Sequence, residues 1–554
     1  MTASKIVKKM IIFSIIGGVL ISTLVQFTDC SSTHDKFDKN TKLMDYGVDV
    51  YDCLLGGAGG SAENQLKKDC LRECPSILEQ LRFDEDIDKS GLETLDHFMK
   101  QYYKYGYLPR EPYDDVPGGE YVTAMDAPLL GVCCQLAYER TGDKKYKKYV
   151  KDLIPYICSD TSSGGFVLKE DRQHWWPLEY AWRKVTPKTA WYVSNGSLYG
   201  TLCIELLWKV TNDKSLRELL DKTLNAYEEH ADEFYYKDDS WTWYSLNSVS
   251  NQPTINRNEK LFIEIRALKA LYKLSNINFY KEEYDHRIKI WKKNYPVYKV
   301  SDSNKTYVSF LRAGAPHPYQ IDIYPTTIKL YDKNNNYVTS VKANDRTVKN
   351  ATIFKQIPAN VEKYRLYARV NDIMDTLIAK GRMKSYTYSD ENKGNVVSYD
   401  NKSVLIDGDS VKYNNNVLCI NADHSDLPKA IVQFKLQEKY KKSNESYWCV
   451  DLTNQSDNDM GIQVVLFDSF GKNTSRYLQA VKPGHNILLF SRLGFEEGYK
   501  LSDVTQVRID FITNALKDKD GLVKINNIYH FSNTVDVVKY VDPLEKEFDD
   551  FWFE

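Results

Sequence analysis

The stretch Leu136-Ala-Tyr-Glu-Arg-Thr-Gly-Asp-Lys-Lys-Tyr146 combines the end of an apolar helix, a tight polar turn and the start of a second helix. Similar stretches follow at Leu207–Leu216 and Leu271–Tyr280, and their starts lie about 64 to 71 residues apart. Helical hairpins that recur along a chain are typical of α/α architectures built from repeats. The sequence therefore predicts an α/α toroid, an incomplete barrel of helical hairpins, over residues 76–296.

After Pro296 the apolar residues alternate with period two. Runs such as Thr306–Leu311, Thr327–Tyr331 and Tyr364–Val370 are separated by turns rich in Asn, Asp and Gly, which is typical of strands. We expect a small β-sandwich at 297–372, a partly helical connector at 373–394, a second β-sandwich at 395–540 and a surface tail at 541–554. The last run, Val523–Phe531, resembles the final strand of jelly-roll carbohydrate-binding modules, so the second sandwich is expected to be jelly-roll-like and to bind carbohydrate.

The N-terminus has the pattern of a signal sequence. Lys5, Lys8 and Lys9 precede Met10–Phe27, a run without a charged residue. Such a run is a signal peptide or a short signal-anchor helix. Because no small-x-small cleavage site follows, we favour a retained single-pass anchor at 1–30, with the bulk outside the cytoplasm in the Golgi lumen or at the cell surface. A cleaved signal, giving a secreted protein, is the alternative. The polar residues 31–75 are expected to form a stalk or linker.

Charge and cysteine content exclude several classes of function. A net charge of −2 over 554 residues gives no general attraction for polyanions, and nothing supports a nucleic-acid partner. Cys53, Cys70 and Cys74 are close enough in sequence for disulfides in an oxidising compartment. No cysteine spacing resembles a complete zinc site, so neither a metal nor a cofactor is predicted. The basic run Lys144–Lys148 is either a solvated helix face or a track for a polyanion.

Aromatic residues are concentrated in the helical region. Seven of the ten tryptophans fall within one stretch of this region: Trp175, Trp176, Trp182, Trp191, Trp208, Trp241 and Trp243. Flat aromatic faces beside fixed charges suit a large hydroxylated, charged ligand such as an acidic polysaccharide. The other interpretation is an aromatic-rich core.

The segment His174-Trp-Trp-Pro-Leu-Glu-Tyr-Ala181, followed by Thr186-Pro and Ser194-Asn-Gly-Ser-Leu-Tyr-Gly200, resembles the C-terminal helical domain of the D-glucuronyl C5-epimerases. More loosely, the resemblance runs from Ala124 to Trp291. It implies conversion of D-glucuronic to L-iduronic acid in a heparosan-like polysaccharide, and it raises the prospect of a homodimer. In the family, however, the β domains precede the helical domain.

The resemblance also implies catalytic residues. Glu179 and Tyr180 match the family's Glu-Tyr pair, and Tyr244 matches a second tyrosine, whereas the family's uronate-binding arginine is Asn247 here. We expect Tyr180 and Tyr244 to carry protons on opposite faces of C5, with Glu179 as a base or orienting group, and Arg183 to replace the missing arginine. The full set of substrate-binding candidates is Arg172, His174, Trp175, Trp176, Arg183, Lys184, Lys188, Asn195, Trp243, Asn247 and Arg257.

Neighbouring cations are needed for a tyrosine to act as a base near neutral pH, because its reference pKa is about 10. The charged candidates above are the groups expected to supply this effect. Asn195 and Gly196 are also expected to open a helix that starts near Ser197, where Asn is a favourable cap. Each of the three proposed catalytic residues has an ordinary structural interpretation as well, as a salt-bridge partner or a core tyrosine.

Two other functions fit the same residues. A polysaccharide lyase removes the same C5 proton but expels the 4-linked sugar, so its chain ends become unsaturated and absorb ultraviolet light. A non-catalytic surface glycan-binding protein would keep the aromatic and charged residues without turnover. The substitution at Asn247 favours the glycan-binding protein.

Overall fold

The computed structural model describes the helical region and most of the strands that follow. The described residues are 40–55, 70–83, 89–108, 110, 112–236, 241–249, 251, 253–256, 258–294, 297–302, 304–311, 323–342, 352–370, 373–388, 395–396, 405–407, 411–414, 417–420, 429–441, 447–455, 460–470, 473–475, 479–481, 483–491, 503–512, 521–533 and 535–540. The expected anchor at 1–30 and the tail at 541–554 lie outside them. Within these ranges no helix has the length and apolar character needed to cross a membrane.

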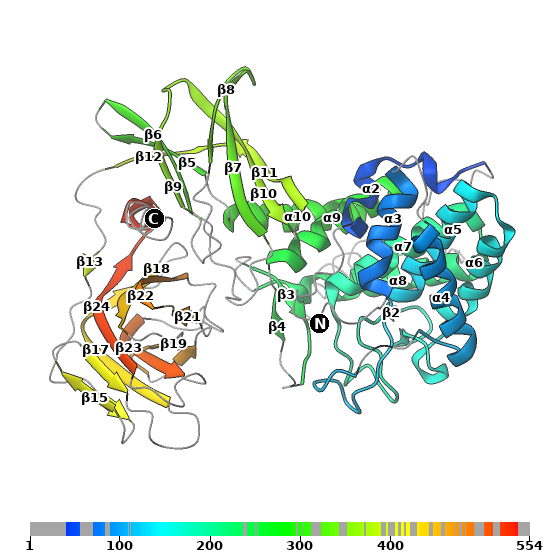
Figure 1. Cartoon of the computed structure of the whole chain (residues 1–554), viewed down its shortest axis with the longest axis horizontal. Helices are drawn as coiled ribbons and strands as arrows, with labels where there is room; N and C mark the ends of the chain where they lie inside the picture. The colour runs from blue at the N-terminus through cyan, green and yellow to red at the C-terminus, as the bar shows by residue number, and fades with distance from the viewer. Residues whose placement is uncertain are drawn as a thin grey trace, which may run out of the picture. The chain divides into compact units, whose positions relative to one another are not determined.

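Five helices form an inner ring: α2 (Val48–Leu55), α3 (Cys70–Phe83), α5 (Asp126–Thr141), α7 (Ser194–Thr211) and α9 (Asn258–Ser275). Contacts run from α3 to α5, from α5 to α7 and from α7 to α9, and α2 closes the ring by contacting both α9 and α3 (Figure 1). Helices α5 and α7 are buried along most of their length. This ring confirms the toroid over the described part of the chain.

Outer helices pack against this ring. These are α4 (Lys89–Tyr105), α6 (Lys144–Ile157), α8 (Lys214–His230) and α10 (Asn278–Asn294). Each of α6, α8 and α10 contacts the inner helix that precedes it in sequence, and α4 contacts both α3 and α5. The inner and outer helices of each repeat therefore form an antiparallel hairpin, as the three similar stretches predict.

The polar turns of the hairpins have matching backbone conformations. Gly142, Asn212 and Asn276 follow the inner helices with φ of 70°, 52° and 55°. Glycine and asparagine tolerate this left-handed region, which ends an α-helix. Asp143 and Asp213 come next and cap the outer helices by accepting hydrogen bonds from backbone N–H groups. Local turn chemistry therefore explains why the stretches could be recognised from sequence.

The expected stalk at 31–75 is wrong for its described part, because the toroid starts earlier. A short 3-10 helix (Leu43–Asp45) precedes α2, and Tyr51, Cys53 and Leu54 are completely buried. The backbone N–H groups of Leu43 and Met44 both donate to the carboxylate of Glu139 on α5, at 3.0 Å each. The polar composition of this segment gave no indication of α2, the short helix whose apolar side completes the ring.

Two short hairpins are inserted between the helical repeats. Strands β1 (Val167–Lys169) and β2 (Trp175–Pro177) pair before α7, and β3 (Trp243–Ser245) pairs with β4 (Thr254–Ile255) before α9. An isolated bridge joins Ser245 to Val193, the residue before α7. The segments around β2 and β3 are thereby held against the first turn of α7.

The first β region consists of two four-stranded sheets. Their orders are β11-β10-β7-β8 and β12-β5-β6-β9. The strands are β5 (Val297–Asp302), β6 (Lys305–Leu311), β7 (Ile323–Asp332), β8 (Tyr337–Lys342), β9 (Thr352–Gln356), β10 (Val361–Val370), β11 (Ile373–Arg382) and β12 (Lys384–Thr387). Phe310 from one sheet and Leu366 from the other belong to the same buried cluster, as expected for a sandwich.

The expected connector at 373–394 is wrong over its first part. Residues Ile373–Arg382 form an edge strand of one sheet, and Lys384–Thr387 pairs in parallel with β5 in the other. The sequence concealed both strands because β10 and β11 are shifted in register by two bulges, which interrupts simple alternation. The small sandwich therefore extends to Thr387.

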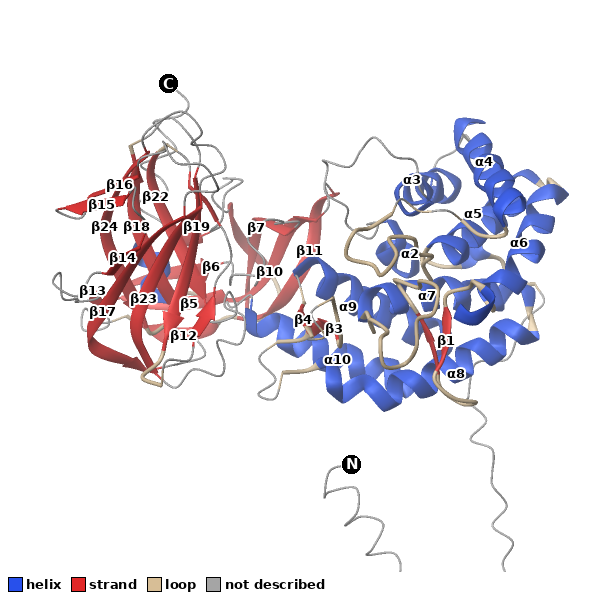
Figure 2. Cartoon of the chain, turned by 90° about the horizontal axis from the view of Figure 1, so that it is seen from below, coloured by secondary structure: helices blue, strands red, loops and turns tan. Residues whose placement is uncertain are grey.

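The second β region has two six-stranded sheets (Figure 2). One has the order β15-β16-β24-β18-β22 with β13 beside β24, and the other has the order β14-β17-β23-β19-β20 with β21 beside β19. The strands are β13 (Asn395–Val396), β14 (Leu405–Asp407), β15 (Val411–Asn414), β16 (Val417–Ile420), β17 (Lys429–Lys441), β18 (Tyr447–Asn454), β19 (Met460–Phe467), β20 (Asn473–Ser475), β21 (Gln479–Val481), β22 (Gly484–Ser491), β23 (Asp503–Ile512) and β24 (Gly521–Phe531). The predicted run Val523–Phe531 lies in β24, between β16 and β18. A carbohydrate-binding role for this region stays a prediction.

Candidate active site

The predicted Glu-Tyr pair lies in a bend directly after β2. The backbone N–H of Ala124 donates to the carbonyl of Leu178, and Val122 forms an antiparallel bridge with Ala181. These contacts fix the bend between the start of α5 and the first turn of α7. Tyr244 reaches the same place from β3. The tertiary structure therefore brings Glu179, Tyr180 and Tyr244 together.

Hydrogen bonds connect the three side chains. The phenol of Tyr244 donates to Oε1 of Glu179 at 3.0 Å, and the phenol oxygens of Tyr180 and Tyr244 lie 3.4 Å apart. A phenol has only one hydrogen to donate. Because Tyr244 gives its hydrogen to Glu179, Tyr180 must donate to Tyr244. The result is a directed chain from Tyr180 through Tyr244 to Glu179.

Glu179 packs closely on the first turn of α7. A Cβ atom added to Gly196 would lie 2.2 Å from Oε2 of Glu179, so no side chain fits at position 196 while Glu179 stays in place. Glu179 is 6 % exposed, and its Oε2 has no hydrogen-bond partner among the described residues. The positive end of the helix dipole favours a carboxylate at this position.

The two phenols are neutral proton donors near neutral pH. Burial, followed by the charge of Glu179, raises the pKa of Tyr180 and of Tyr244 well above 10. Both residues are half-buried, although the phenol groups themselves lie in the interior. Neither acts as a phenolate base without a group that accepts its proton.

The expected cations do not supply that effect. Arg172, Arg183, Lys184 and Lys188 are all exposed, and none is among the main causes of the phenol pKa shifts. Their role in binding a substrate is not tested by this arrangement. Arg257 lies outside the described residues.

An aromatic group surrounds Tyr180. Its ring centroid lies 5.3 Å from Tyr121, 6.0 Å from Tyr113 and 5.5 Å from Trp191. Trp191 in turn lies 5.4 Å from Trp182. Tyr113 is 43 % exposed, so this group opens to solvent on the side of the loop after α4. Flat, partly exposed aromatic faces next to hydrogen-bonding groups are suited to sugar rings.

Sequence reasoning missed the guanidinium that borders this group. Arg110 makes a two-pronged ion pair with Asp126, with distances of 2.7 and 2.8 Å, and its Cζ atom lies 5.8 Å from the centroid of the Tyr121 ring. Arg110 precedes α5 in an irregular loop, where no periodicity marks it. Asp126 stands next to Met125 in the region of family resemblance, and this acidic residue was the only sequence signal that pointed to a basic partner such as Arg110.

The remaining candidates are placed elsewhere. Trp176 is 1 % exposed and packs on Tyr227 and Phe234, so it belongs to the core. Trp175 faces Lys169 and Lys222, whose ammonium groups lie 4.4 and 4.0 Å from its ring centroid. Among the other substrate-binding candidates, His174 pairs with Asp171, Trp243 packs on Tyr236, and Asn247 is half-buried.

Asn195 does not cap α7, which corrects the expected helix start. The helix begins at Ser194 with Val193 as its N-cap residue, so Asn195 lies within the first turn. Asn195 is 1 % exposed, and neither of its side-chain polar atoms has a partner among the described residues. The bridge between Val193 and Ser245 sets this earlier start, and sequence alone does not reveal it.

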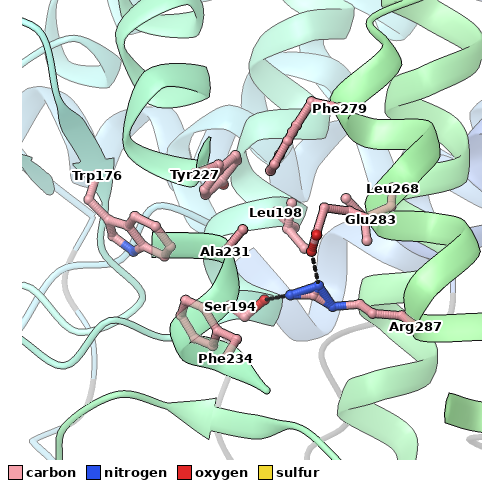
Figure 3. Close-up of a pocket in the computed structure, with 10 residues that line it drawn as sticks. All are labelled: Trp176, Ser194, Leu198, Tyr227, Ala231, Phe234, Leu268, Phe279, Glu283 and Arg287. Carbon is pink, nitrogen blue, oxygen red and sulfur yellow. Dashed lines mark hydrogen bonds and ion pairs between the residues drawn. The ribbon is translucent and has the colours of Figure 1, made fainter. Parts of the chain in front are cut away.

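A hollow lies beside the first turn of α7 (Figure 3). It encloses about 270 Å³, part of it open to solvent, and is lined mainly by aromatic and apolar side chains. Arg287 at its base donates to Ser194 and pairs with Glu264 and Glu283. Burial raises the pKa of Glu264 to about 7, although Arg287 opposes the shift. Since Arg287 already pairs with two carboxylates, this hollow has no positive charge to spare for an acidic ligand.

The fold and the cluster define a helical toroid with a Glu-Tyr-Tyr group in the loops above its ring. Residues 95–289 match the D-glucuronyl C5-epimerase C-terminus, which confirms the resemblance seen in the sequence. The match covers about a third of the chain and lies within the helical domain. No curated protein matches the chain.

Several solved structures are distantly similar. A glycoside hydrolase family 76 mannosidase from Bacteroides thetaiotaomicron is 14% identical over 46% of this chain and 72% of its own, with a TM-score of 0.29. A cellobiose 2-epimerase from Bacillus thermoamylovorans is 11% identical over 40% of this chain and 60% of its own, at 0.30. An agarase is 13% identical over 25% of this chain and 26% of its own, at 0.20. The chain thus spans about a quarter of the agarase, and TM-scores this low carry no argument.

Proposed function

We propose that the protein is a uronyl C5-epimerase that converts D-glucuronic to L-iduronic acid residues in a heparosan-like polysaccharide. The observation that carries this proposal is the hydrogen-bonded chain of Tyr180, Tyr244 and Glu179. It unites the three family-matched residues, which come from segments 64 residues apart, within a partly exposed aromatic group. Such a group supplies both a proton acceptor and a proton donor, as epimerisation requires.

The reaction needs the two phenols on opposite faces of the sugar ring. A carbon placed about 3 Å from each of two oxygens holds them roughly 6 Å apart. The 3.4 Å contact between Tyr180 and Tyr244 must therefore open when a uronate enters. The half-buried rings and the exposed edge at Tyr113 leave a route for this opening.

Proton transfer then follows the direction of the hydrogen bonds. Tyr244 takes the C5 proton while its own phenol proton passes to Glu179, and Tyr180 delivers its phenol proton to the opposite face of C5. After release the product leaves Glu179 protonated and Tyr180 as a phenolate. When the two phenols meet again, the proton returns from Glu179 through Tyr244 to Tyr180. The contact between the two phenols thus provides the path by which the site is reset.

The carboxylate of the substrate needs a cation, since its negative charge increases in the transition state. Arg183 is exposed, whereas Arg110 is held by Asp126 against Tyr121, whose ring contacts Tyr180. We therefore favour Arg110 over Arg183 as the hydrogen-bond donor to this carboxylate, with its own charge balanced by Asp126. The predicted membrane anchor and homodimer would place and assemble this enzyme, and they stay proposals.

A lyase is the second candidate, because the phenol oxygens of Tyr180 and Tyr244 lie only 3.4 Å apart. An elimination in which the base and the leaving-group acid share one face of the sugar would need no opening of the pair. The same residues would then cleave the chain and leave unsaturated ends. The two reactions differ in whether the polymer stays intact.

The test is incubation of the protein with heparosan in heavy water, followed by NMR at C5 and by ultraviolet absorbance. An epimerase incorporates deuterium at C5 without absorbance, and a lyase gives absorbing ends. Tyr180→Phe and Tyr244→Phe should each remove the activity, whereas Tyr337→Phe, at an exposed tyrosine of β8, should retain it. Full activity in both site variants would refute the assignment. Binding without either reaction would establish a glycan-binding protein.

A further inference from the structure

The basic run Lys144–Lys148 lies beside the end of α4, where several tyrosines are exposed. Tyr103, Tyr105 and Tyr107 are 50 %, 45 % and 38 % exposed. These values are high for aromatic side chains, which are mostly buried. Exposed tyrosines and lysines are therefore concentrated at the end of α4 and on α6, and the residues Tyr103, Tyr105, Tyr107, Lys104, Lys147 and Lys148 are together called the tyrosine–lysine surface below.

The tyrosine–lysine surface is held in place by contacts between α4 and α6. The phenol of Tyr103 donates to Asp152 at 2.5 Å, and the phenol of Tyr102 donates to the Asp152 carbonyl at 3.0 Å. Lys148 pairs with Asp152 and lies 5.3 Å from the centroid of the Tyr103 ring. These bonds fix the exposed ring of Tyr103, so less conformational entropy is lost when a ligand stacks on it.

Ammonium groups lie close to rings in this surface. The ammonium group of Lys104 lies 4.7 Å from the centroid of the Tyr105 ring, and the rings of Tyr105 and Tyr107 lie 6.1 Å apart. Lys147 is exposed on α6, and its ammonium group lies 5.4 Å from the centroid of the Tyr138 ring of α5. Rings that stack on sugars and ammonium groups that pair with carboxylates match the two repeating features of an acidic polysaccharide.

A short loop connects this surface to the candidate active site. Tyr107 and Tyr113 are six residues apart, hence separated by at most about 20 Å. Tyr113 begins a turn in which its backbone N–H donates to the carbonyl of Gly119 at 2.9 Å. The ring of Tyr113 lies 6.0 Å from that of Tyr180. An exposed ring therefore lies at the rim of the site, no more than about 20 Å from Tyr107.

We propose that the tyrosine–lysine surface binds the part of an acidic polysaccharide chain that extends beyond the uronate in the candidate active site. This inference rests on the proposed function and adds the chain length that the protein recognises. An anionic membrane surface fits less well, because the phenol of Tyr103 is bound to a carboxylate and cannot enter a lipid layer without losing that bond.

The test compares long and short ligands by calorimetry at low salt. The variant Lys104→Ala/Lys147→Ala should bind heparosan polymer about 2- to 25-fold more weakly, since each exposed ion pair contributes a factor of roughly 1.4 to 5. Its affinity for a heparosan tetrasaccharide, and its C5 exchange on that tetrasaccharide, should not change. Tyr105→Ala/Tyr107→Ala should weaken polymer binding by a similar factor without altering either tetrasaccharide measurement.

The matched controls are Lys289→Ala/Lys292→Ala, two exposed lysines of α10, and Tyr337→Ala on β8. Both should bind the polymer as the unaltered protein does. Equal polymer affinity in the surface variants and the unaltered protein would overturn the proposal. Loss of binding to vesicles of anionic phospholipid, with polymer binding unchanged, would overturn it in favour of a membrane. Failure of the proposed function is seen separately, as absence of any reaction on the tetrasaccharide.

Discussion

Adding a single methyl group at Gly196 should reduce the activity of the site strongly and the stability of the fold only slightly. In Gly196→Ala the new Cβ would lie 2.2 Å from Oε2, 2.7 Å from Cβ and 2.8 Å from Cδ of Glu179. An ordinary contact begins near 3.4 Å, so the carboxylate must move by more than about 1 Å. The hydrogen bond from Tyr244, now 3.0 Å, would then exceed hydrogen-bonding distance.

The expected loss of stability is small. Overpacking of a buried position costs about 1 to 3 kcal/mol, and replacing glycine by alanine within a helix returns about 1 kcal/mol. The free energy of unfolding should therefore fall by roughly 0 to 2 kcal/mol. The loss of activity should be larger, since a misplacement of about 1 Å in a catalytic group can reduce the rate about 100-fold.

The assay is deuterium incorporation at C5 of heparosan, measured beside thermal unfolding. Gly131→Ala is the matched control, because Gly131 is a glycine of the inner helix α5 whose new Cβ would meet only the flexible end of Leu207, at 2.9 Å. It should unfold at a similar temperature to Gly196→Ala and keep its activity. If Gly196→Ala exchanges deuterium as fast as Gly131→Ala, the position of Glu179 does not control the reaction and the proton chain is wrong.

Three further predictions concern stability. Burial lowers the pKa of His230, but its hydrogen bonds to Glu170 and Glu233 outweigh burial and raise this pKa overall. The stability that protonated His230 contributes is thus complete below pH 6.5 and is lost as pH rises through the folded-state pKa. His230→Gln should therefore lower the melting temperature more at pH 5.5 than at pH 9. For Glu264 the pKa is raised from 4.5 to about 7, so stability falls between these values by up to roughly 3 kcal/mol. Glu264→Gln should flatten this decline in denaturant titrations, and an unchanged slope would contradict the assignment. Trp291→Phe removes the 2.9 Å bond from the indole N–H to the carbonyl of Ile378, which should cost about 1 to 3 kcal/mol in urea unfolding, and no loss would show that α10 and β11 are not held by this bond.

Local sequence determined the elements whose signals are themselves local. The hairpin turns were recognisable because glycine or asparagine ends one helix and aspartate caps the next. The runs from Thr306 to Val370 showed the alternation of strands that bury one face. Glu179, Tyr180 and Tyr244 were found through family resemblance, because the distance of 64 residues between them carries no periodic signal.

Only the tertiary structure decided which charges and rings meet. Arg110 and Tyr113 join the aromatic group through an irregular loop, whereas Arg183 and Lys188, which are closer in sequence to Tyr180, are exposed. Helix α2 completes the ring from a polar segment, and β11 and β12 pair across bulges that disturb the alternation. Sequence specifies backbone conformation over a few residues, but contacts between distant segments depend on how whole elements pack. That is the physical reason why the fold could be predicted in outline and the surroundings of the site could not.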